Sequence, residues 1–270
     1  MKTEQKWKIG DCLQLLQGIP DKSVDMILTD LPYGTTQNRW DAIIPPEELW
    51  LQYERIITNN GVILLFGHDK FTAKMMLSNQ KIHRYNLIWD KELVTGFLNA
   101  NRMPLRQHED IMVFYKESPV YNPQKICGVK NHSVGKMLKG KKSDCYGEYV
   151  KVDNSEVLGN TKYPTSILQF PKPHASICRH EAEKPLTLFE YLIKTYTNEG
   201  DTVHDSCLGS GTTLEACMNL NRNCIGFEID PQWGPIYRKR LRLDNTKLDA
   251  FNTSRSPHAA SLCAVPLVRK

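Results

Sequence analysis

The sequence predicts an α/β fold, because short apolar runs typical of buried strands alternate with segments of helical periodicity. Two observations support this fold class most directly. The apolar run Val24–Leu28 is stopped abruptly by Pro32 and Gly34. A second run, which ends at Asp205, leads through a glycine-rich turn into a helical pattern. A chain of 270 residues can hold one such core together with an inserted or appended subdomain.

The predicted elements follow along the chain. We expect strands over residues 7–9, 24–28, 62–66, 85–89, 110–115, 203–205 and 224–228, and helices over residues 12–19, 46–58, 186–195 and from 212. Asp11 occupies the N-cap position of the first helix. Pro46 and Pro185 open the helices at those positions, and Asn60–Gly61 ends the earlier of these two. The strand over residues 110–115 is expected to pair with the one over residues 85–89.

The tetrapeptide Asp30-Leu31-Pro32-Tyr33 follows a buried strand, and open α/β sheets bind ligands at that edge. The Asp30 carboxylate and the Leu31 carbonyl can accept both hydrogens of an amino group on a planar heterocycle, while Tyr33 stacks on the ring. These acceptors would aim the lone pair of the amine at an electrophile. The plainer interpretation is a strand followed by a turn, and the tetrapeptide alone does not decide between the two.

A second stretch, residues 203–213, reads Val-His-Asp-Ser-Cys-Leu-Gly-Ser-Gly-Thr-Thr. Gly209 and Gly211 permit a tight turn from strand to helix and let a ligand approach the backbone. The free amides at the helix start favour a carboxylate or a phosphate. Glu228, at the end of the next strand, can accept both ribose hydroxyls of a nucleoside cofactor.

Together, Asp30-Leu31-Pro32-Tyr33 and the stretch from Asp205 to Thr213 resemble motifs IV and I of the S-adenosylmethionine-dependent amino DNA methyltransferases. Their order resembles the beta class, whose members modify adenine N6 or cytosine N4. The likeness covers roughly residues 7–240. It implies a Rossmann-like, mostly parallel methyltransferase sheet with an antiparallel terminal strand and an inserted target-recognition region. It also implies that the late strand before the glycine turn lies beside the strand that ends at Asp30.

The resemblance assigns site residues by position. The catalytic set is Asp30, Leu31, Pro32 and Tyr33. The residues expected at S-adenosyl-L-methionine are Asp11, Lys184, Asp205, Ser206, Cys207, Gly209, Ser210, Gly211, Thr212 and Glu228. Lys184 belongs to a Lys-Pro pair that resembles family motif X. Leu31 stands where the family more often has proline, and Ser206-Cys207 stands where Pro-Phe is common.

Several polar and basic residues are expected to contact DNA: Asn38, Arg39, Arg102, Arg106, Lys139, Lys141 and Lys142. Between residues 116 and 175 lysines are interleaved with tyrosines, which suits phosphate neutralisation and base stacking. A solvated surface is the plainer interpretation of these basic segments. His68 and Asp69 follow a strand, and we favour loop structure or cofactor proximity for them over catalysis.

The resemblance implies four parts: a catalytic half over residues 1–115, a target-recognition region over 116–175, a cofactor-binding half over 176–244 and a flexible tail over 245–270. The predicted function is site-specific transfer of a methyl group to adenine N6 in double-stranded DNA, with extrusion of the base. Adenine is preferred because Asp-first motifs accompany it more often in this family. The alternatives are a cytosine-N4 enzyme, an RNA or protein-glutamine methyltransferase, and a catalytically silent DNA-binding regulator.

The bulk composition agrees with a nucleic-acid partner without establishing one, since the formal charge is +5 and the pI about 8.7. The eight cysteines include no C-x-x-C pair, which favours reduced thiols and predicts no metal site. Neither a signal peptide nor a long apolar run is expected, so the prediction is a cytoplasmic protein of a bacterial cell or phage-infected host, with no membrane partner. A homodimer and a cognate restriction endonuclease remain open as partners.

Overall fold

The computed structural model describes residues 3–36, 41–128, 161–173 and 183–243. Five of the predicted DNA contacts lie outside these described residues: Asn38, Arg39, Lys139, Lys141 and Lys142. The predicted tail over residues 245–270 also lies outside them.

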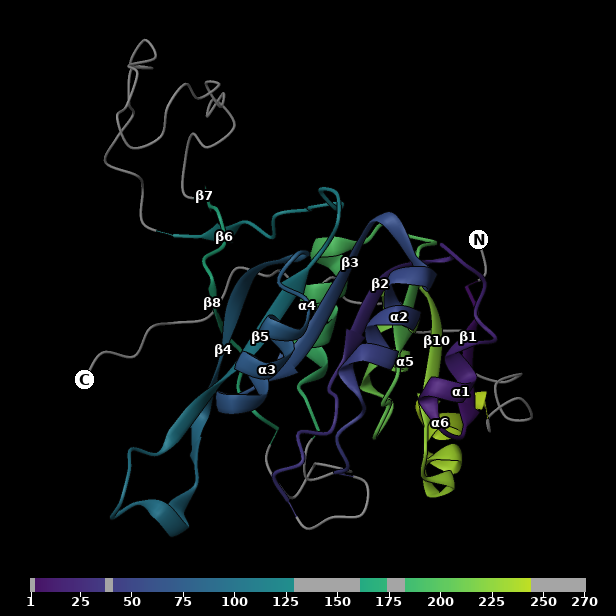
Figure 1. Ribbon diagram of the computed structural model, residues 1–270. Helices are drawn as coiled ribbons and strands as arrows, with labels where there is room; N and C mark the ends of the chain where they lie inside the picture. Colours follow the sequence, from purple (N-terminus) through teal and green to yellow (C-terminus); the bar gives the residue numbers. More distant parts are fainter. Residues whose placement is uncertain (1–2, 37–40, 129–160, 174–182, 244–270) are drawn as a thin grey trace, which may run out of the picture. The chain divides into compact units, whose positions relative to one another are not determined.

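Eight strands form one sheet in the order β1-β10-β9-β2-β3-β5-β4-β8 (Figure 1). The strands are β1 (Gln5–Ile9), β2 (Val24–Thr29), β3 (Ile57–Gly67), β4 (His83–Thr95), β5 (Arg106–Phe114), β8 (Ile167–Gln169), β9 (Thr202–Asp205) and β10 (Asn223–Glu228). Every neighbouring pair is parallel except the two pairs that β5 makes. The predicted mostly parallel sheet is therefore confirmed.

The antiparallel strand is β5, which lies between β3 and β4 and pairs with both. The sequence led us to expect an antiparallel strand at the end of the sheet, whereas β5 lies inside it. The expected pairing of residues 85–89 with 110–115 is confirmed. A hairpin joins β4 to β5, so these two strands must run in opposite directions. Because β5 inserts beside β3, β4 runs parallel to β3, and its carboxyl end reaches the same edge of the sheet.

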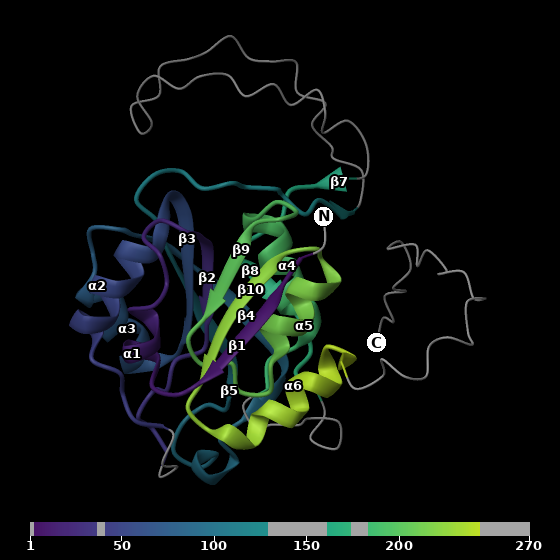
Figure 2. The same cartoon turned by 90° about the vertical axis from the view of Figure 1, so that its right-hand side faces the viewer.

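Within the described residues, six α-helices cover the two faces of this sheet. They are α1 (Cys12–Leu16), α2 (Pro46–Ile56), α3 (Asp69–Ser78), α4 (Leu186–Tyr196), α5 (Thr212–Asn219) and α6 (Gly234–Arg240), and two 3-10 helices span Phe97–Asn99 and Pro231–Trp233. Figure 2 shows α1, α2 and α3 on one face and α4, α5 and α6 on the other. None of the helices in the described part of the chain is long and apolar enough to cross a membrane.

The central strand β2 explains the two-sided core. Met26 and Leu28 pack in the cluster that includes α4 and α5, whereas Ile27 packs in the cluster that includes α1 and α2. All three side chains are fully buried. A strand covered on both faces reads as a continuous apolar run, which is why the sequence predicted it without an alternating pattern.

Helix α3 was not predicted. Its buried side chains, Phe71, Thr72 and Met75, make a short apolar stripe among lysines, and a stripe this narrow gives weak periodicity. The helix begins directly after β3, so His68 becomes its N-cap residue and Asp69 its first residue.

The described chain divides into two compact units. One comprises residues 3–122 and 166–243 and contains the eight-stranded sheet; the other comprises residues 123–128 and 161–165 and contains β6 (Ile126–Cys127) paired antiparallel with β7 (Thr161–Lys162). The four sequence-based parts, including a recognition region over residues 116–175, remain predictions.

Candidate active site

The carboxyl ends of four parallel strands meet at one edge of the large sheet: β2, β3, β9 and β10. β2 pairs directly with β9, and β9 pairs with β10. Asp30 follows the end of β2, Asp205 ends β9 and Glu228 ends β10. The late strand before the glycine turn therefore lies beside the strand that ends at Asp30, as expected from the sequence.

The carboxylate of Asp30 is held from two sides. The Tyr33 hydroxyl donates to Oδ1 at 2.5 Å, and the Lys184 ammonium donates to Oδ2 at 2.5 Å. Burial and the neighbouring Asp30 carboxylate raise the pKa of Tyr33 well above its ordinary value, so the phenol keeps its proton and remains a donor. Each Asp30 oxygen has accepted one hydrogen bond and retains a further lone pair.

Lys184 lies in a buried charge network. Its ammonium is 3.2 Å from Oε2 of Glu109, and Oε1 of Glu109 is 3.3 Å from the Lys91 ammonium. Burial alone would lower the pKa of Lys184, but the carboxylates of Asp30 and Glu109 outweigh it and hold that pKa above its usual range. For Glu109 burial would raise the pKa, but the ammonium groups of Lys184 and Lys91 outweigh burial and lower it. This network was not foreseen: the sequence-based role of Lys184 was at the cofactor.

The loop after Tyr33 closes on a buried carboxylate. The amides of Gly34 and Thr35 donate to Asp41 at 2.8 Å each, and the amide of Thr36 donates at 2.6 Å. Burial would raise the pKa of Asp41, but these amides lower it. Asp41 thereby anchors the end of the turn that carries Asp30 and Tyr33, a structural role that sequence reasoning missed.

The glycine turn follows β9. Asp205 accepts a hydrogen bond from the Cys207 amide at 3.0 Å and another from the Thr213 hydroxyl, and burial raises its pKa to about 6. Gly209 and Gly211 both have positive φ angles, +50° and +83°. Only glycine adopts these angles without strain, which is why the turn needs both residues.

Glu228 binds the same turn. Its Oε2 accepts from the Gly209 amide at 2.8 Å, and its Oε1 accepts from the Asp230 amide at 3.0 Å. Burial raises the pKa of Glu228 above its ordinary value. A Cβ added to Gly209 would meet no atom within 4 Å, so the backbone beside the Glu228 carboxylate is open to a ligand.

Asp11 caps α1, since its side chain accepts from the Gln14 amide at 3.1 Å, and the predicted N-cap role is confirmed. The preceding residue, Gly10, donates its amide to the Glu228 carbonyl at 2.8 Å. The Asp11 loop therefore lies at the end of β10, beside the glycine turn. A role at the adenine of a cofactor remains a prediction.

The Ser206 side chain faces the core rather than the open side of the turn. The Tyr53 hydroxyl donates to the Ser206 hydroxyl at 2.7 Å, and Ser206 is 2.9 Å from Nε2 of His204. Nδ1 of His204 is 2.8 Å from the Ile225 carbonyl. Since a carbonyl can only accept, Nδ1 carries the proton and Nε2 accepts from Ser206. Burial lowers the pKa of His204 to about 4, which keeps this ring neutral.

Ser210 and Thr212 are buried at the start of α5, with their hydroxyls 3.3 Å apart. Arg240 of α6 donates to the Ser210 hydroxyl at 3.3 Å and also forms ion pairs with Glu183 and, at 2.6 Å, with Glu215. Glu183 directly precedes Lys184. Arg240 thereby ties the glycine turn to the segment that carries Lys184.

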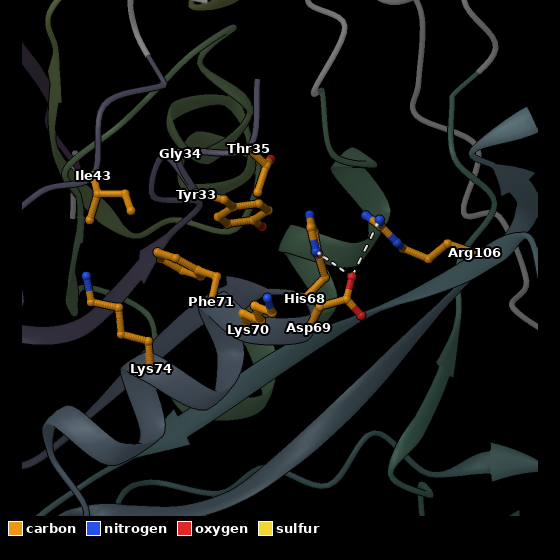
Figure 3. Close-up of a pocket in the computed structure, with 10 residues that line it drawn as sticks. All are labelled: Tyr33, Gly34, Thr35, Ile43, His68, Asp69, Lys70, Phe71, Lys74 and Arg106. Atoms are coloured by element: carbon orange, nitrogen blue, oxygen red, sulfur yellow. Dashed lines mark hydrogen bonds and ion pairs between the residues drawn. The ribbon is translucent and has the colours of Figure 1, made fainter. Parts of the chain in front are cut away.

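A pocket of about 670 Å³ opens beside Tyr33 (Figure 3). The Tyr33 ring packs against Phe71 and His68, with centroids 4.7 and 4.9 Å apart. The other lining residues are Gly34, Thr35, Ile43, Asp69, Lys70, Lys74 and Arg106. The pocket therefore combines aromatic rings with three cationic side chains, a set suited to a planar base next to a phosphate.

His68 and Asp69 form part of this pocket. Nδ1 of His68 is 3.2 Å from Asp69, and the Arg106 guanidinium is 3.5 Å from the same carboxylate oxygen (Figure 3). Burial, supported by the Arg106 charge, lowers the pKa of His68 and favours the neutral ring. Arg106 is thus placed at the pocket, whereas Arg102 lies on the exposed hairpin between β4 and β5. No group of three or more potential metal ligands is present among the described residues.

The sequence matches a protein-family model described as DNA methylase, of the N6 and N4 type, over residues 24–238. Two similar proteins are the Type II methyltransferase M.HpaI of Haemophilus parainfluenzae and the Type II methyltransferase M.BamHI of Bacillus amyloliquefaciens. The first is 24% identical over 99% of this chain and 83% of its own length; the second is 26% identical over 82% of this chain and 53% of its own length.

Two solved structures share the fold. The M1.HpyAVI–SAM complex aligns with a TM-score of 0.58 at 21% identity, over 88% of this chain and 98% of that one. The cytosine-N4-specific PvuII DNA methyltransferase aligns with a TM-score of 0.60 at 17% identity, over 89% of this chain and 87% of that one.

Proposed function

Because the chain belongs to the DNA methylase family of the N6 and N4 type, we propose that it methylates adenine at N6 in double-stranded DNA. The observation that carries the proposal is the Asp30 carboxylate, held by Tyr33 and Lys184 at the end of β2, one strand away from the glycine turn of β9. A methyl donor on that turn and an amine at Asp30 would be neighbours.

The cofactor of this family is S-adenosylmethionine, and M1.HpyAVI was solved as a complex with it. When bound, it supplies an electrophilic methyl group on sulfur. In this chain Glu228 is the residue proposed to hold the ribose hydroxyls, and Gly209 leaves room at the backbone. Asp11, Cys207 and Thr212 are proposed to complete the site.

The target base must leave the duplex before its amine can reach a site at a strand end. The pocket beside Tyr33 offers it aromatic side chains, and base–aromatic stacking is worth about 1–3 kcal/mol. Asp30 and the Leu31 carbonyl would accept the two amine hydrogens and orient the nitrogen lone pair. Such positioning of the nucleophile supplies much of the rate in a direct displacement. The released proton goes to water or passes through Asp30.

Adenine N6 is favoured over cytosine N4 by the aspartate that heads the tetrapeptide, since Asp-first motifs accompany adenine more often in this family. Leucine at position 31 does not weaken the proposal, because the group required there is a main-chain carbonyl. Leu31 is buried, which helps to hold the turn in place of the more usual proline.

The β4–β5 hairpin is the proposed DNA-contacting element within the described residues. It leaves the sheet at the same edge as Asp30 and reaches beyond the sheet (Figure 1). Its tip exposes apolar side chains: Phe97 is 67% exposed, Leu98 101% and Met103 56%. Arg102 lies beside this tip. Cations would neutralise phosphates, and apolar side chains can enter an opened base step.

The test is transfer of a labelled methyl group from S-adenosylmethionine to unmethylated DNA, followed by digestion to nucleosides. We expect N6-methyladenine from the wild type and none from Asp30→Ala, with Glu117→Ala as an exposed carboxylate control. N4-methylcytosine as the only product would overturn the choice of base. Label on RNA or protein, or DNA binding without transfer by folded, cofactor-bound protein, would overturn the DNA-enzyme assignment.

A homodimer, a cognate endonuclease and a cytoplasmic setting stay predictions.

A further inference from the structure

Lys184 is a buried cation shared by two carboxylates. Its side chain is 8% exposed, and its ammonium lies 2.5 Å from Asp30 and 3.2 Å from Glu109. Two aromatic rings flank the ammonium, with the centroids of Phe66 and Trp89 at 5.2 and 5.8 Å. Such an environment excludes water from the lysine and strengthens its electrostatic contacts.

The charges around Lys184 balance. Asp30 and Glu109 are acidic, and Lys184 and Lys91 are basic, with Lys91 only 4% exposed at its side chain. A buried ion pair tolerates the loss of neither partner, because the remaining charge is left uncompensated. Removing Lys184 would leave two carboxylates facing one another with a single remote ammonium, on the far side of Glu109.

The geometry at Asp30 is asymmetric. Tyr33 donates to one oxygen and Lys184 to the other, so the carboxylate is fixed in rotation about its bond to Cβ. Tyr33 comes from the same turn as Asp30, whereas Lys184 is 154 residues away. Lys184 therefore links the proposed cofactor-binding half of the chain to the turn over residues 30–33, and it sets the orientation of the Asp30 carboxylate.

We propose, on the basis of the proposed methyl transfer to an amine, that Lys184 is a positioning residue which holds the Asp30 carboxylate in the single orientation that receives the amine. Lys184 already carries all three of its protons, so it does not take up the proton that the amine releases. It acts only through Asp30. This role differs from the cofactor contact expected from the sequence, because the ammonium donates a hydrogen bond to Asp30 and forms an ion pair with Glu109.

The charged and titratable groups around Asp30 come from several elements. Tyr33 faces it from the catalytic turn, Lys184 from the segment before α4 and Asp205 from the end of β9, while Glu109 of β5 acts across Lys184. Without the ammonium, the Asp30 carboxylate loses its charge-assisted hydrogen bond and its fixed orientation. The acid limb of the methyl-transfer rate should then move to higher pH, because removing a buried positive charge disfavours the charged form of the acids around it.

The test compares Lys184→Met, Lys184→Arg and Lys184→Met/Glu109→Gln with the wild type, and uses Lys194→Met, an exposed lysine on α4, as the control. Single-turnover methylation of DNA is measured against pH with saturating S-adenosylmethionine, alongside cofactor affinity and thermal unfolding. Wild-type transfer to DNA tests the proposed function separately from the role of Lys184.

We expect Lys184→Met to slow transfer by about 100-fold near neutral pH and to move the acid limb upward by at least about one pH unit, with cofactor affinity within about threefold of wild type. Lys184→Arg should regain much of the rate, and the double variant should move the acid limb back towards wild type.

A loss of cofactor affinity that matches the loss of rate, at an unchanged pH profile, would assign Lys184 to the cofactor and overturn the proposal. If Lys184→Met does not fold, Lys184→Arg decides: slower transfer with cofactor affinity within about threefold of wild type would support the proposal, and a loss of cofactor affinity that matches the loss of rate would overturn it.

Discussion

The phenolic oxygen of Tyr33 lies 2.5 Å from Oδ1 of Asp30, and the ring of the same tyrosine packs against Phe71 in the wall of the pocket. One residue thus joins the acceptor carboxylate to the surface on which a base would rest. The distance between the two is set by a three-residue turn rather than by contacts between domains.

Tyr33 therefore has two separable roles, and two substitutions distinguish them. Tyr33→Phe keeps the ring but removes a hydrogen bond worth about 0.5–1.5 kcal/mol, so we expect single-turnover methylation to slow by about 3–10-fold. Tyr33→Ala also removes stacking worth about 1–3 kcal/mol, so we expect a larger loss. Equal losses in both variants would assign the whole effect to the hydroxyl.

The two glycines of the β9–α5 turn should respond differently to alanine. Both have positive φ, which costs a non-glycine residue about 1–2 kcal/mol. At Gly211 an added Cβ would also stand 2.7 Å from the Tyr237 ring, whereas at Gly209 it would meet only open space. Gly211→Ala should lose more stability, measured by urea unfolding. Gly209→Ala should mainly weaken S-adenosylmethionine binding, measured by calorimetry, and unchanged affinity there would argue against a cofactor at this turn.

The exposed tip of the β4–β5 hairpin should affect DNA binding without affecting stability. We expect Leu98→Asp to weaken DNA binding, because an apolar side chain at a base step is replaced by a charge that repels phosphate. Leu77→Asp is the matched control, since Leu77 is 67% exposed on α3. Arg102→Ala should reduce the slope of log affinity against log salt by about one if it contacts a phosphate. Equal weakening by Leu77→Asp and Leu98→Asp would mean that the hairpin has no special role.

His204 should make the protein sensitive to mild acid. Burial lowers its pKa from 6.5 to about 4 in the folded chain. Between these values the unfolded chain takes up a proton that the folded chain does not, so the free energy of unfolding falls as pH falls. From pH 7 to pH 5 the contribution of His204 to this loss is about 1–2 kcal/mol. Asp205, whose pKa burial raises to about 6, acts in the opposite direction in every variant that retains it.

The measurement is urea unfolding at pH 7 and pH 5 for the wild type and His204→Gln. The variant lacks the titrating ring, so its free energy of unfolding should rise by about 1–2 kcal/mol relative to the wild type on going from pH 7 to pH 5, even though it loses packing at both pH values. The same pH dependence in both proteins would show that His204 does not carry the effect.

Local chemistry in the sequence located most of the strands and helices. It also located the turns that follow β2 and β9. Proline and glycine keep β2 from continuing beyond Thr29, and Gly209 and Gly211 bend the chain into α5, because turn conformations depend on a few consecutive residues. Both turns could therefore be located before the fold was known. The cap of α1 by Asp11 was predictable for the same reason.

Only the tertiary structure decided which distant side chains meet. The pairing of Lys184 with Asp30, the insertion of β5 between β3 and β4, and the neutral His204 beneath the glycine turn all join segments that are far apart in the chain. No local pattern encodes such contacts, because burial and the pairing of charges depend on how whole elements pack. The sequence by itself determined where the turns lie, and packing decided that a lysine from the other half of the chain holds the carboxylate at one of them.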